Sequence, residues 1–295
     1  MYEDILFPFD GSDGAAEVLH HAAEIANWAD GTIRLLYVAD TTEVSVARTG
    51  GEVVDGLIEH GEEILETATA TLDTLGTDYA TDIVQGTPAE TIVDYAERRG
   101  HDVIVMPTQG RTGLSRYLLG SVTEKVVRLS ETPVLTARMQ PDEKLTYPYG
   151  DILVPTDGSS AAESAAVHAL NLAATLDSTV HVISVVDTGS LGPDVRSETL
   201  ASAGKDAATE AVATIENAAE RQGIDDVHTH VEHGSPDSGI LEYIDDEEID
   251  AVVLGTTGRR GVERVLLGSV AEKTVRSAPV PVVTVPETDD AGTSL

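Results

Sequence analysis

The sequence predicts an α/β protein built from two copies of one domain, each a parallel sheet of five strands with helices on both faces. Short apolar segments alternate with amphipathic helical patterns, which is typical of a parallel sheet covered on both sides. The first half also recurs in the second, because residues 2–12 align with 149–159 and residues 132–136 align with 280–284. The offset stays at 147 or 148 along the 295-residue chain, so we infer a duplicated domain and not a short-period solenoid.

In the first half, the first expected strand ends at Asp10-Gly-Ser, and a helix with Ala15, Leu19, Ala22 and Ala26 on its apolar face follows. A long helix is expected to end near residue 75. The next spans 88–99, where proline fits the first helical turn because its missing N–H costs nothing there, and the last begins at residue 121. The expected strands span 4–9, 32–38, 79–84, 103–106 and 133–137.

The second half repeats this order, and a capping box of Ser160 and Glu163 is expected at the start of its first helix. Its expected strands span 151–155, 179–185, 227–232, 250–254 and 281–285. Between the halves, two prolines and the lack of any periodic pattern predict a linker. The expected parts are a first domain at 1–138, the linker at 139–148, a second domain at 149–286 and a polar tail at 287–295.

Charge and composition restrict the partners of the chain. It holds 52 acidic residues against 18 basic ones, and the net charge of −34 would repel nucleic acid and anionic membranes. Few of the basic residues are lysines, and Phe and Trp are rare, so the composition resembles that of proteins from salt-loving archaea. The alternative is an acidic protein with an acidic partner-binding face. Cysteine is absent, no apolar run approaches the ~20 residues that span a bilayer, and a strand follows Met1 closely, so we expect a cytoplasmic protein without disulfides.

A glycine-rich loop follows the fourth expected strand of each half. In the second half, two residues separate Gly255 from Gly258, nine more precede Gly268, and Ser269 follows directly. Glycine lets a ligand approach the backbone, and free N–H groups at a helix start attract anions, so the loop predicts a phosphate seat. The first half keeps three of these positions and has proline at the first: Pro107, Gly110, Gly120 and Ser121.

This spacing resembles the nucleotide-binding signature of the universal stress protein family, and the resemblance covers nearly the whole chain twice. It implies two tandem flavodoxin-like domains of the HUP or Rossmann-like type, each with strand order 3-2-1-4-5. In such a sheet the ligand lies beyond the carboxyl ends of the strands, where the strand order reverses. The residues alone do not establish that the first and fourth strands are neighbours.

The resemblance also implies that the ligand is an adenine nucleotide such as ATP, with Mg²⁺ arriving on the nucleotide. Asp157 would face the adenine beside the backbone of Val185, while the loop glycines and Ser269 would hold ribose and phosphates. Asp-Gly-Ser is also ordinary turn chemistry, so a turn role for Asp10 and Asp157 is the alternative. The full set of expected binding residues is Pro155, Asp157, Val185, Leu254, Gly255, Gly258, Gly268, Ser269 and Val270 in the second half, and Pro8, Asp10, Val38, Met106, Gly110, Gly120, Ser121 and Val122 in the first.

The basic residues gather around these loops. Residues 110–128 hold four basic residues and one acidic residue, and residues 258–276 hold five basic and two acidic ones, so nine of the 18 basic residues lie there. A polyphosphate ligand would account for this bias in an acidic protein. Pairing of these basic side chains with the surplus carboxylates is the alternative.

Neither a metal centre nor a catalytic site is indicated by the remaining residues. His228, His230 and His233 lie close together in the sequence, and alternation places His228 and His230 on one face of the expected strand. Spacing fixes no third ligand, so an exposed strand edge is favoured over a metal site. No nucleophile elbow or P-loop sequence occurs, which excludes an efficient motor-type ATPase and leaves at most slow ATP hydrolysis.

We therefore predict an ATP-binding regulatory protein of the stress response, with a complete site in the second half and an altered one in the first. The two halves are expected to pair through their fifth strands as a pseudo-dimer within the chain, which could associate further into a homodimer. The alternatives are a nucleotide-free interaction or scaffold module, and a weak ATPase of the related adenine-nucleotide-dependent α/β group.

Overall fold

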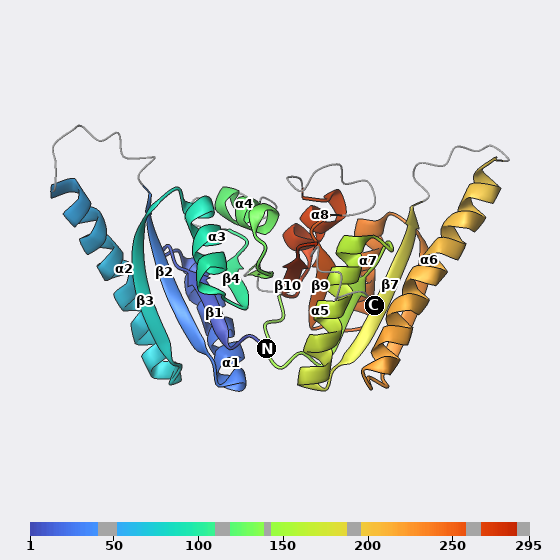
Figure 1. Ribbon diagram of the computed structural model, residues 1–295, viewed down its shortest axis with the longest axis horizontal. Coiled ribbons are helices and arrows are strands. Elements are labelled where there is room, and N and C mark those ends of the chain that lie inside the picture. Colours follow the sequence, from blue (N-terminus) through green and yellow to red (C-terminus); the bar gives the residue numbers. More distant parts are fainter. Residues whose placement is uncertain (41–51, 110–118, 139–142, 188–195, 258–266, 288–295) are drawn as a thin grey trace. The chain divides into compact units, whose positions relative to one another are not determined.

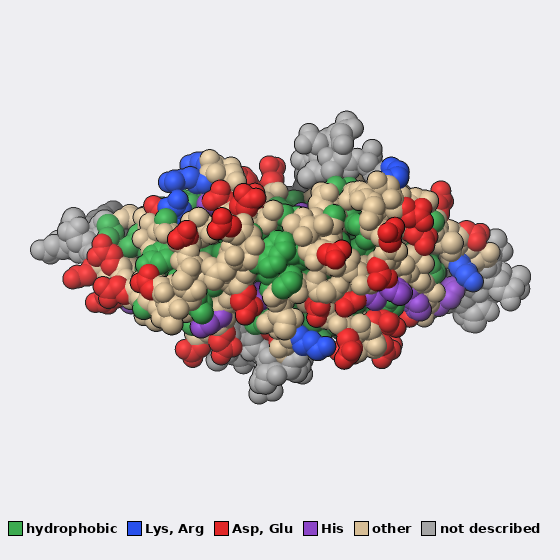
Figure 2. Space-filling view, turned by 90° about the horizontal axis from the view of Figure 1, so that it is seen from below, with side chains coloured by type: hydrophobic (Ala, Val, Ile, Leu, Met, Phe, Trp, Pro, Cys, Tyr) green, Lys and Arg blue, Asp and Glu red, His purple; other side chains and the backbone are tan. Residues whose placement is uncertain are grey.

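The computed structural model describes residues 1–40, 52–109, 119–138, 143–187, 196–257 and 267–287. The chain forms two compact units, Met1–Pro141 and Asp142–Leu295, and each contains five neighbouring parallel strands (Figure 1). None of the helices in these described ranges combines the length and the hydropathy needed to cross a bilayer. Acidic side chains are spread over the face shown in Figure 2, and basic ones are few there.

The first unit has the strand order β3-β2-β1-β4-β5, with all neighbouring strands parallel. Helices α1 and α2 contact each other, as do α3 and α4, and right-handed crossovers place the two pairs on opposite faces of the sheet. Figure 1 shows α2 and α3 on opposite sides of β2 and β3. The elements are β1 (Asp4–Pro8), α1 (Asp13–Ala29), β2 (Thr32–Asp40), α2 (Glu52–Leu75), β3 (Tyr79–Gly86), α3 (Pro88–Arg99), β4 (Val103–Pro107), α4 (Ser121–Leu129) and β5 (Val134–Ala137).

The second unit repeats this topology as β8-β7-β6-β9-β10. The order 3-2-1-4-5 is therefore confirmed in both units, and with it the predicted fold class. The elements are β6 (Asp151–Pro155), α5 (Ser160–Leu176), β7 (Thr179–Asp187), α6 (Arg196–Arg221), β8 (Val227–Gly234), α7 (Pro236–Asp246), β9 (Ala251–Gly255), α8 (Ser269–Ser277) and β10 (Val282–Val285).

The core of each unit follows the apolar pattern of the sequence. Ala15, Leu19, Ala22 and Ala26 of α1 are all at most 1% exposed, which confirms the expected apolar face of that helix. The central strands β4 and β9 are apolar and buried on both faces, as parallel strands between helical layers require. Burial holds β4 and β9 in place, and the candidate site lies at the carboxyl ends of these strands.

Several boundaries differ from those expected. Strands β2, β3, β7 and β8 each run two residues further, to Asp40, Gly86, Asp187 and Gly234, because backbone pairing between β2 and β3 and between β7 and β8 continues where the apolar pattern has ended. The first helix of the second unit is capped by Ser159, whose Oγ accepts from the Ala162 N–H at 3.3 Å, so the expected capping box at Ser160 is wrong by one residue. The side chain that accepts a hydrogen bond from a first-turn N–H belongs to the residue directly before the first helical residue.

The described part of the expected linker belongs to the second unit. The Lys144 N–H donates to the Pro279 carbonyl at 2.9 Å, and the rings of Tyr147 and Tyr149 meet edge to face with centroids 5.0 Å apart. At the carboxyl end of the second unit, the first residue of the expected tail is held in a similar way, because Ser160 Oγ donates to Glu287 Oε1 at 2.5 Å. Residues 143–148 are thus tied to the unit that they precede.

Candidate nucleotide site

In the first unit, the first and fourth strands are neighbours and part at their carboxyl ends. Their last pair is Leu6 with Ile104, which confirms the adjacency that the residues alone did not establish. Beyond this pair, β1 stays with β2 as far as Pro8, and β4 stays with β5 as far as Pro107. The strands thus separate at the point where the strand order reverses, which is where open α/β sheets bind ligands.

The second unit shows the same separation. The last pair between β6 and β9 is Leu153 with Val252. Strand β6 continues with β7 as far as Pro155, and β9 continues with β10 as far as Gly255. The turn after β6 and the residues directly after β9 therefore begin on either side of the parted strand ends.

The aspartates after β1 and β6 both form turns with the serine two residues later. Asp10 Oδ1 accepts from the backbone N–H of Ser12 at 3.0 Å and from its hydroxyl at 2.6 Å. Asp157 Oδ1 accepts from the Ser159 N–H at 3.0 Å. These bonds place Ser12 and Ser159 as the caps of α1 and α5, so the turn role is confirmed. Asp157 is exposed at the carboxyl edge of the sheet.

The expected phosphate seat includes the start of the last helix in each unit. Helix α8 begins at Ser269 after the cap residue Gly268, whose N–H donates to the Thr256 carbonyl at 2.8 Å, while α4 begins at Ser121 after Gly120. Glycine offers no side-chain acceptor to the first-turn N–H groups of the helix. A helix start without a side-chain cap is a natural place for an anion.

Gly255 has a packing role that reasoning from the sequence missed. A Cβ atom at this position would lie 2.6 Å from the carbonyl oxygen of Ala161, in the first turn of α5. The absent side chain therefore lets the helix approach the strand. When the caps Ser12 and Ser159 are aligned, Gly14 stands at the position of Ala161, and Pro107 stands at that of Gly255. In the first unit the smaller residue is on the helix and the larger one on the strand.

The remaining expected residues surround the same strand ends. Val38 and Val185 are partly exposed and lie two residues before the ends of β2 and β7. Met106 and Leu254 are each 4% exposed and lie one residue before the ends of β4 and β9. Pro8 is partly exposed and Pro155 is buried at the ends of β1 and β6, and Val122 and Val270 are partly exposed in the first turns of α4 and α8. Gly110 and Gly258 lie outside the described residues.

The basic residues near the loops differ in their partners. Lys273 Nζ donates to Asp237 Oδ2 at 3.0 Å, and Arg276 pairs with Glu272 on the same helix. Lys125 is exposed and makes no ion pair with any residue of the described ranges. Internal pairing, the alternative to a polyphosphate ligand, therefore holds for Lys273 and Arg276. The arginines at 111, 116, 259, 260 and 264 lie outside the described part of the chain.

Two stretches of the sequence, residues 1–138 and 148–286, match the model of the universal stress protein family. The chain belongs to the universal stress protein family. Each match spans one of the two repeats, so this is a tandem member with two such domains. The family and the strand order agree with what the resemblance in the glycine spacing implied.

Individual relatives match one repeat at a time. Universal stress protein MJ0531 of Methanocaldococcus jannaschii is 38% identical over 141 residues, which cover 47% of this chain and 83% of that protein. Universal stress protein MJ0577 of the same organism is 33% identical over 155 residues, covering 47% of this chain and 96% of that protein. A solved universal stress protein from Archaeoglobus fulgidus shares the fold over 98% of both chains, with a TM-score of 0.73 at 24% identity.

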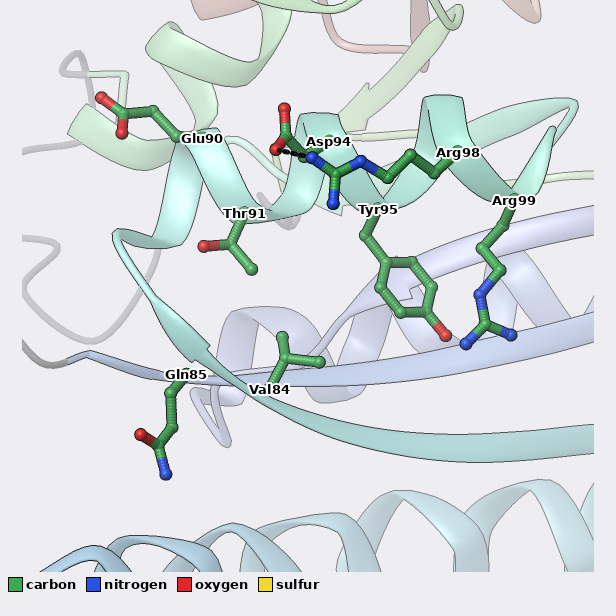
Figure 3. Close-up of a pocket in the computed structure, with 8 residues that line it drawn as sticks. All are labelled: Val84, Gln85, Glu90, Thr91, Asp94, Tyr95, Arg98 and Arg99. Carbon is green, nitrogen blue, oxygen red and sulfur yellow. Dashed lines mark hydrogen bonds and ion pairs between the residues drawn. The ribbon is translucent and has the colours of Figure 1, made fainter.

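A hollow of about 530 Å³ lies between β3 and α3 of this universal stress protein, away from the expected seat (Figure 3). Its two arginines are already engaged: Arg98 pairs with Asp94 at 3.0 Å, and the Arg99 guanidinium lies 5.0 Å from the centre of the Tyr95 ring. The Tyr95 hydroxyl donates to Asp82 at 2.5 Å, and burial, followed by this hydrogen bond, raises the Tyr95 pKa to about 12. We assign this hollow no ligand.

A smaller hollow of about 200 Å³ adjoins the turn after β6. Thr156 and Gly158 line one side of it, and Glu163 and Glu210 from α5 and α6 are among its other lining residues. Two carboxylates make this hollow unsuitable for phosphate groups. The residues that line these two hollows do not include Gly268, so neither hollow contains the expected phosphate seat.

The histidines of β8 lie on the edge strand of their sheet. His228 and His230 have side chains that are 59% and 45% exposed, which confirms the expected exposed edge. His228 stacks on His181 with ring centroids 4.9 Å apart, and His181 bonds Asp151 and Tyr243 at 3.1 Å each. In the described ranges, no three His, Asp or Glu residues are arranged to hold a metal ion.

Proposed function

We propose that this universal stress protein is a regulatory protein that binds an adenine nucleotide, ATP above all, at the carboxyl edge of its second unit. The observation that carries the proposal is the start of α8, which has a glycine cap and lies beside parted strands. A triphosphate there would accept hydrogen bonds from the first-turn N–H groups and gain from the helix dipole.

The arrangement also supports the nucleoside end of the ligand. The Asp157 turn lies across the parted strand ends from the phosphate seat, and β7 continues beyond β6 with Val185 partly exposed. The family signature, complete at Gly255, Gly258, Gly268 and Ser269, points to an adenine nucleotide. The first unit keeps the same frame with Pro107, so we propose a second, altered site there. Mg²⁺ would be bound through the phosphates.

The substitution Gly268→Asp tests the phosphate seat. Gly268 has φ −63° and ψ 144°, which any residue adopts, and aspartate is a good helix cap, so the second unit should fold normally. The new carboxylate would accept the N–H bonds that a phosphate needs and would repel its charge. We expect ATP affinity at the second site to fall by on the order of tenfold or more in calorimetric titrations.

Two further variants locate the effect. Gly268→Asn also caps the helix but adds no charge, so it should lower the affinity less than Gly268→Asp. The matched substitution Gly120→Asp should silence the first site and leave the second intact. Unchanged ATP affinity in Gly268→Asp, with both sites measured, would place the phosphate seat elsewhere.

The alternative functions differ in what the purified protein carries. Bound adenine nucleotide after gentle purification, detected by absorbance and mass spectrometry, is expected from our proposal, whereas a nucleotide-free scaffold would carry none and bind none on titration. Slow ATP hydrolysis would appear as phosphate release that Gly268→Asp abolishes. Pairing of the two halves, a further homodimer and a cytoplasmic location stay predictions of the sequence.

A further inference from the structure

The lysine one turn into the last helix has a different environment in the two units. In the second unit, Lys273 Nζ donates to Asp237 Oδ2 at 3.0 Å, and Ser235 Oγ donates to the other oxygen of Asp237 at 2.6 Å. In the first unit, Lys125 stands at the equivalent position, and buried Ala89 replaces the aspartate. Lys125 is exposed and forms no ion pair within the described part of the chain.

Each lysine lies on the helix whose start is the proposed phosphate seat of its unit: Lys125 on α4 and Lys273 on α8. Lys273 follows Ser269 by four residues, so the two side chains lie on the same face of α8. Long helical side chains lean toward the helix N-terminus, which brings the lysine ammonium toward the level of the first turn. Helices α7 and α8 both begin at the carboxyl edge of the sheet, where the nucleotide is proposed to bind. The ammonium therefore contributes to the charge that an anion at Ser269 experiences.

Asp237 is held as a carboxylate in this position. Hydrogen bonds from Ser235 and then from Lys273 lower the pKa of the Asp237 carboxyl from its ordinary value. Asp237 also lies in the first turn of α7, where a negative charge interacts favourably with the helix dipole. The carboxylate thus offsets the charge of Lys273, whereas Lys125 has no such partner among the described residues.

We propose that Asp237 is a specificity-determining residue of the second phosphate seat, because it holds Lys273 and reduces the positive charge available to phosphates. The first seat, with Lys125 unpaired among the described residues, favours highly charged nucleotides more strongly. The ratio of ATP affinity to AMP affinity is then larger at the first site than at the second. This inference rests on the proposed nucleotide binding and adds that the two sites differ in phosphate preference.

The experiment measures one site at a time in the full-length chain. Gly120→Asp silences the first site, and in this background Asp237→Asn should raise ATP affinity about two- to fivefold, with a smaller gain for AMP. Adding Lys273→Gln should return the affinity to near its starting value, because the released ammonium is then gone. In the Gly268→Asp background, Lys125→Gln should lower ATP affinity at the first site by a similar factor.

The outcomes separate this inference from the proposed function. If the chain with Gly120→Asp alone binds no ATP, nucleotide binding itself is refuted for the second site. If it binds ATP but Asp237→Asn leaves the affinity unchanged, or the gain survives the added Lys273→Gln, the role of Asp237 is refuted. Thermal melting checks that the variants fold. Should Asp237→Asn fail to fold, an unchanged first-site affinity in Lys125→Gln would overturn the proposal.

Discussion

The substitution Gly255→Ala separates two roles of the first signature glycine. The added methyl carbon would lie 2.6 Å from the Ala161 carbonyl oxygen and 2.7 Å from its carbonyl carbon, both of them backbone atoms that cannot rotate away. Real Cβ contacts stay above 3.0 Å, so β9 and the first turn of α5 must move apart by at least 0.4 Å, the difference between 3.0 and 2.6 Å. We expect this shift to destabilise the second unit.

The magnitude follows from two opposing effects. Overpacking of a tight contact costs about 1–3 kcal/mol. Replacing glycine by alanine also restricts the unfolded chain, which returns roughly 0.4–1 kcal/mol. A net loss of about 1–2 kcal/mol should remain, which corresponds to a fall of roughly 2–8 °C in the melting temperature of a unit of this size.

Calorimetric melting and urea denaturation of the full chain measure the loss. Combining Gly255→Ala with Ala161→Gly removes only the third contact, that of the Ala161 Cβ at 3.0 Å, and leaves both backbone contacts in place, so the stability should not return. An unchanged melting temperature for Gly255→Ala, together with weaker ATP binding, would refute the packing role and assign the glycine to the ligand alone.

Two further predictions concern the difference between the units. Burial lowers the pKa of His168 to about 4 from 6.5, so the neutral ring stabilises the fold above pH 6.5 and this contribution is lost as the pH falls from 6.5 toward 4. Asn171→Glu, which copies the His21–Glu24 pair of the first unit at 3.5 Å, should reduce the loss in pH-dependent melting, and identical pH profiles would contradict this. Pro107→Gly restores a backbone N–H at the carboxyl edge and should raise first-site ATP affinity about tenfold in the Gly268→Asp background, whereas equal affinities would show that the proline has no functional weight.

The sequence predicted the positions of the helices and strands better than it predicted which strands are neighbours. Local patterns placed nearly all helices and strands within two residues, because apolar periodicity and helix caps are properties of neighbouring residues. The adjacency of β1 and β4 joins segments about 100 residues apart, and it came from the family resemblance. The ends of β2, β3, β7 and β8 were missed because their last two residues are held by backbone pairing between neighbouring strands.

The candidate site was predictable in its parts but not in its contacts. The glycine spacing located the loop, and Asp-Gly-Ser located the turns. The contact between Gly255 and Ala161, and the pair of Lys273 with Asp237, depend on how helices pack against strands and against each other. The origin from a salt-loving organism stays a prediction, since an acidic surface alone does not distinguish it from an acidic partner-binding face.

The two units differ at the contact between the fourth strand and the first helix: the second has Gly255 on the strand and Ala161 on the helix, and the first has Pro107 and Gly14 at these positions. This difference bears on how the two repeats can evolve. A recombination event that copied α5 of the second repeat into the first would place Ala161 opposite Pro107, and the reverse event would place Gly14 opposite Gly255. In both products the residue on the helix would face a strand residue that belongs with the other repeat. We expect both to pack less well at this contact, which would disfavour gene conversion within this segment.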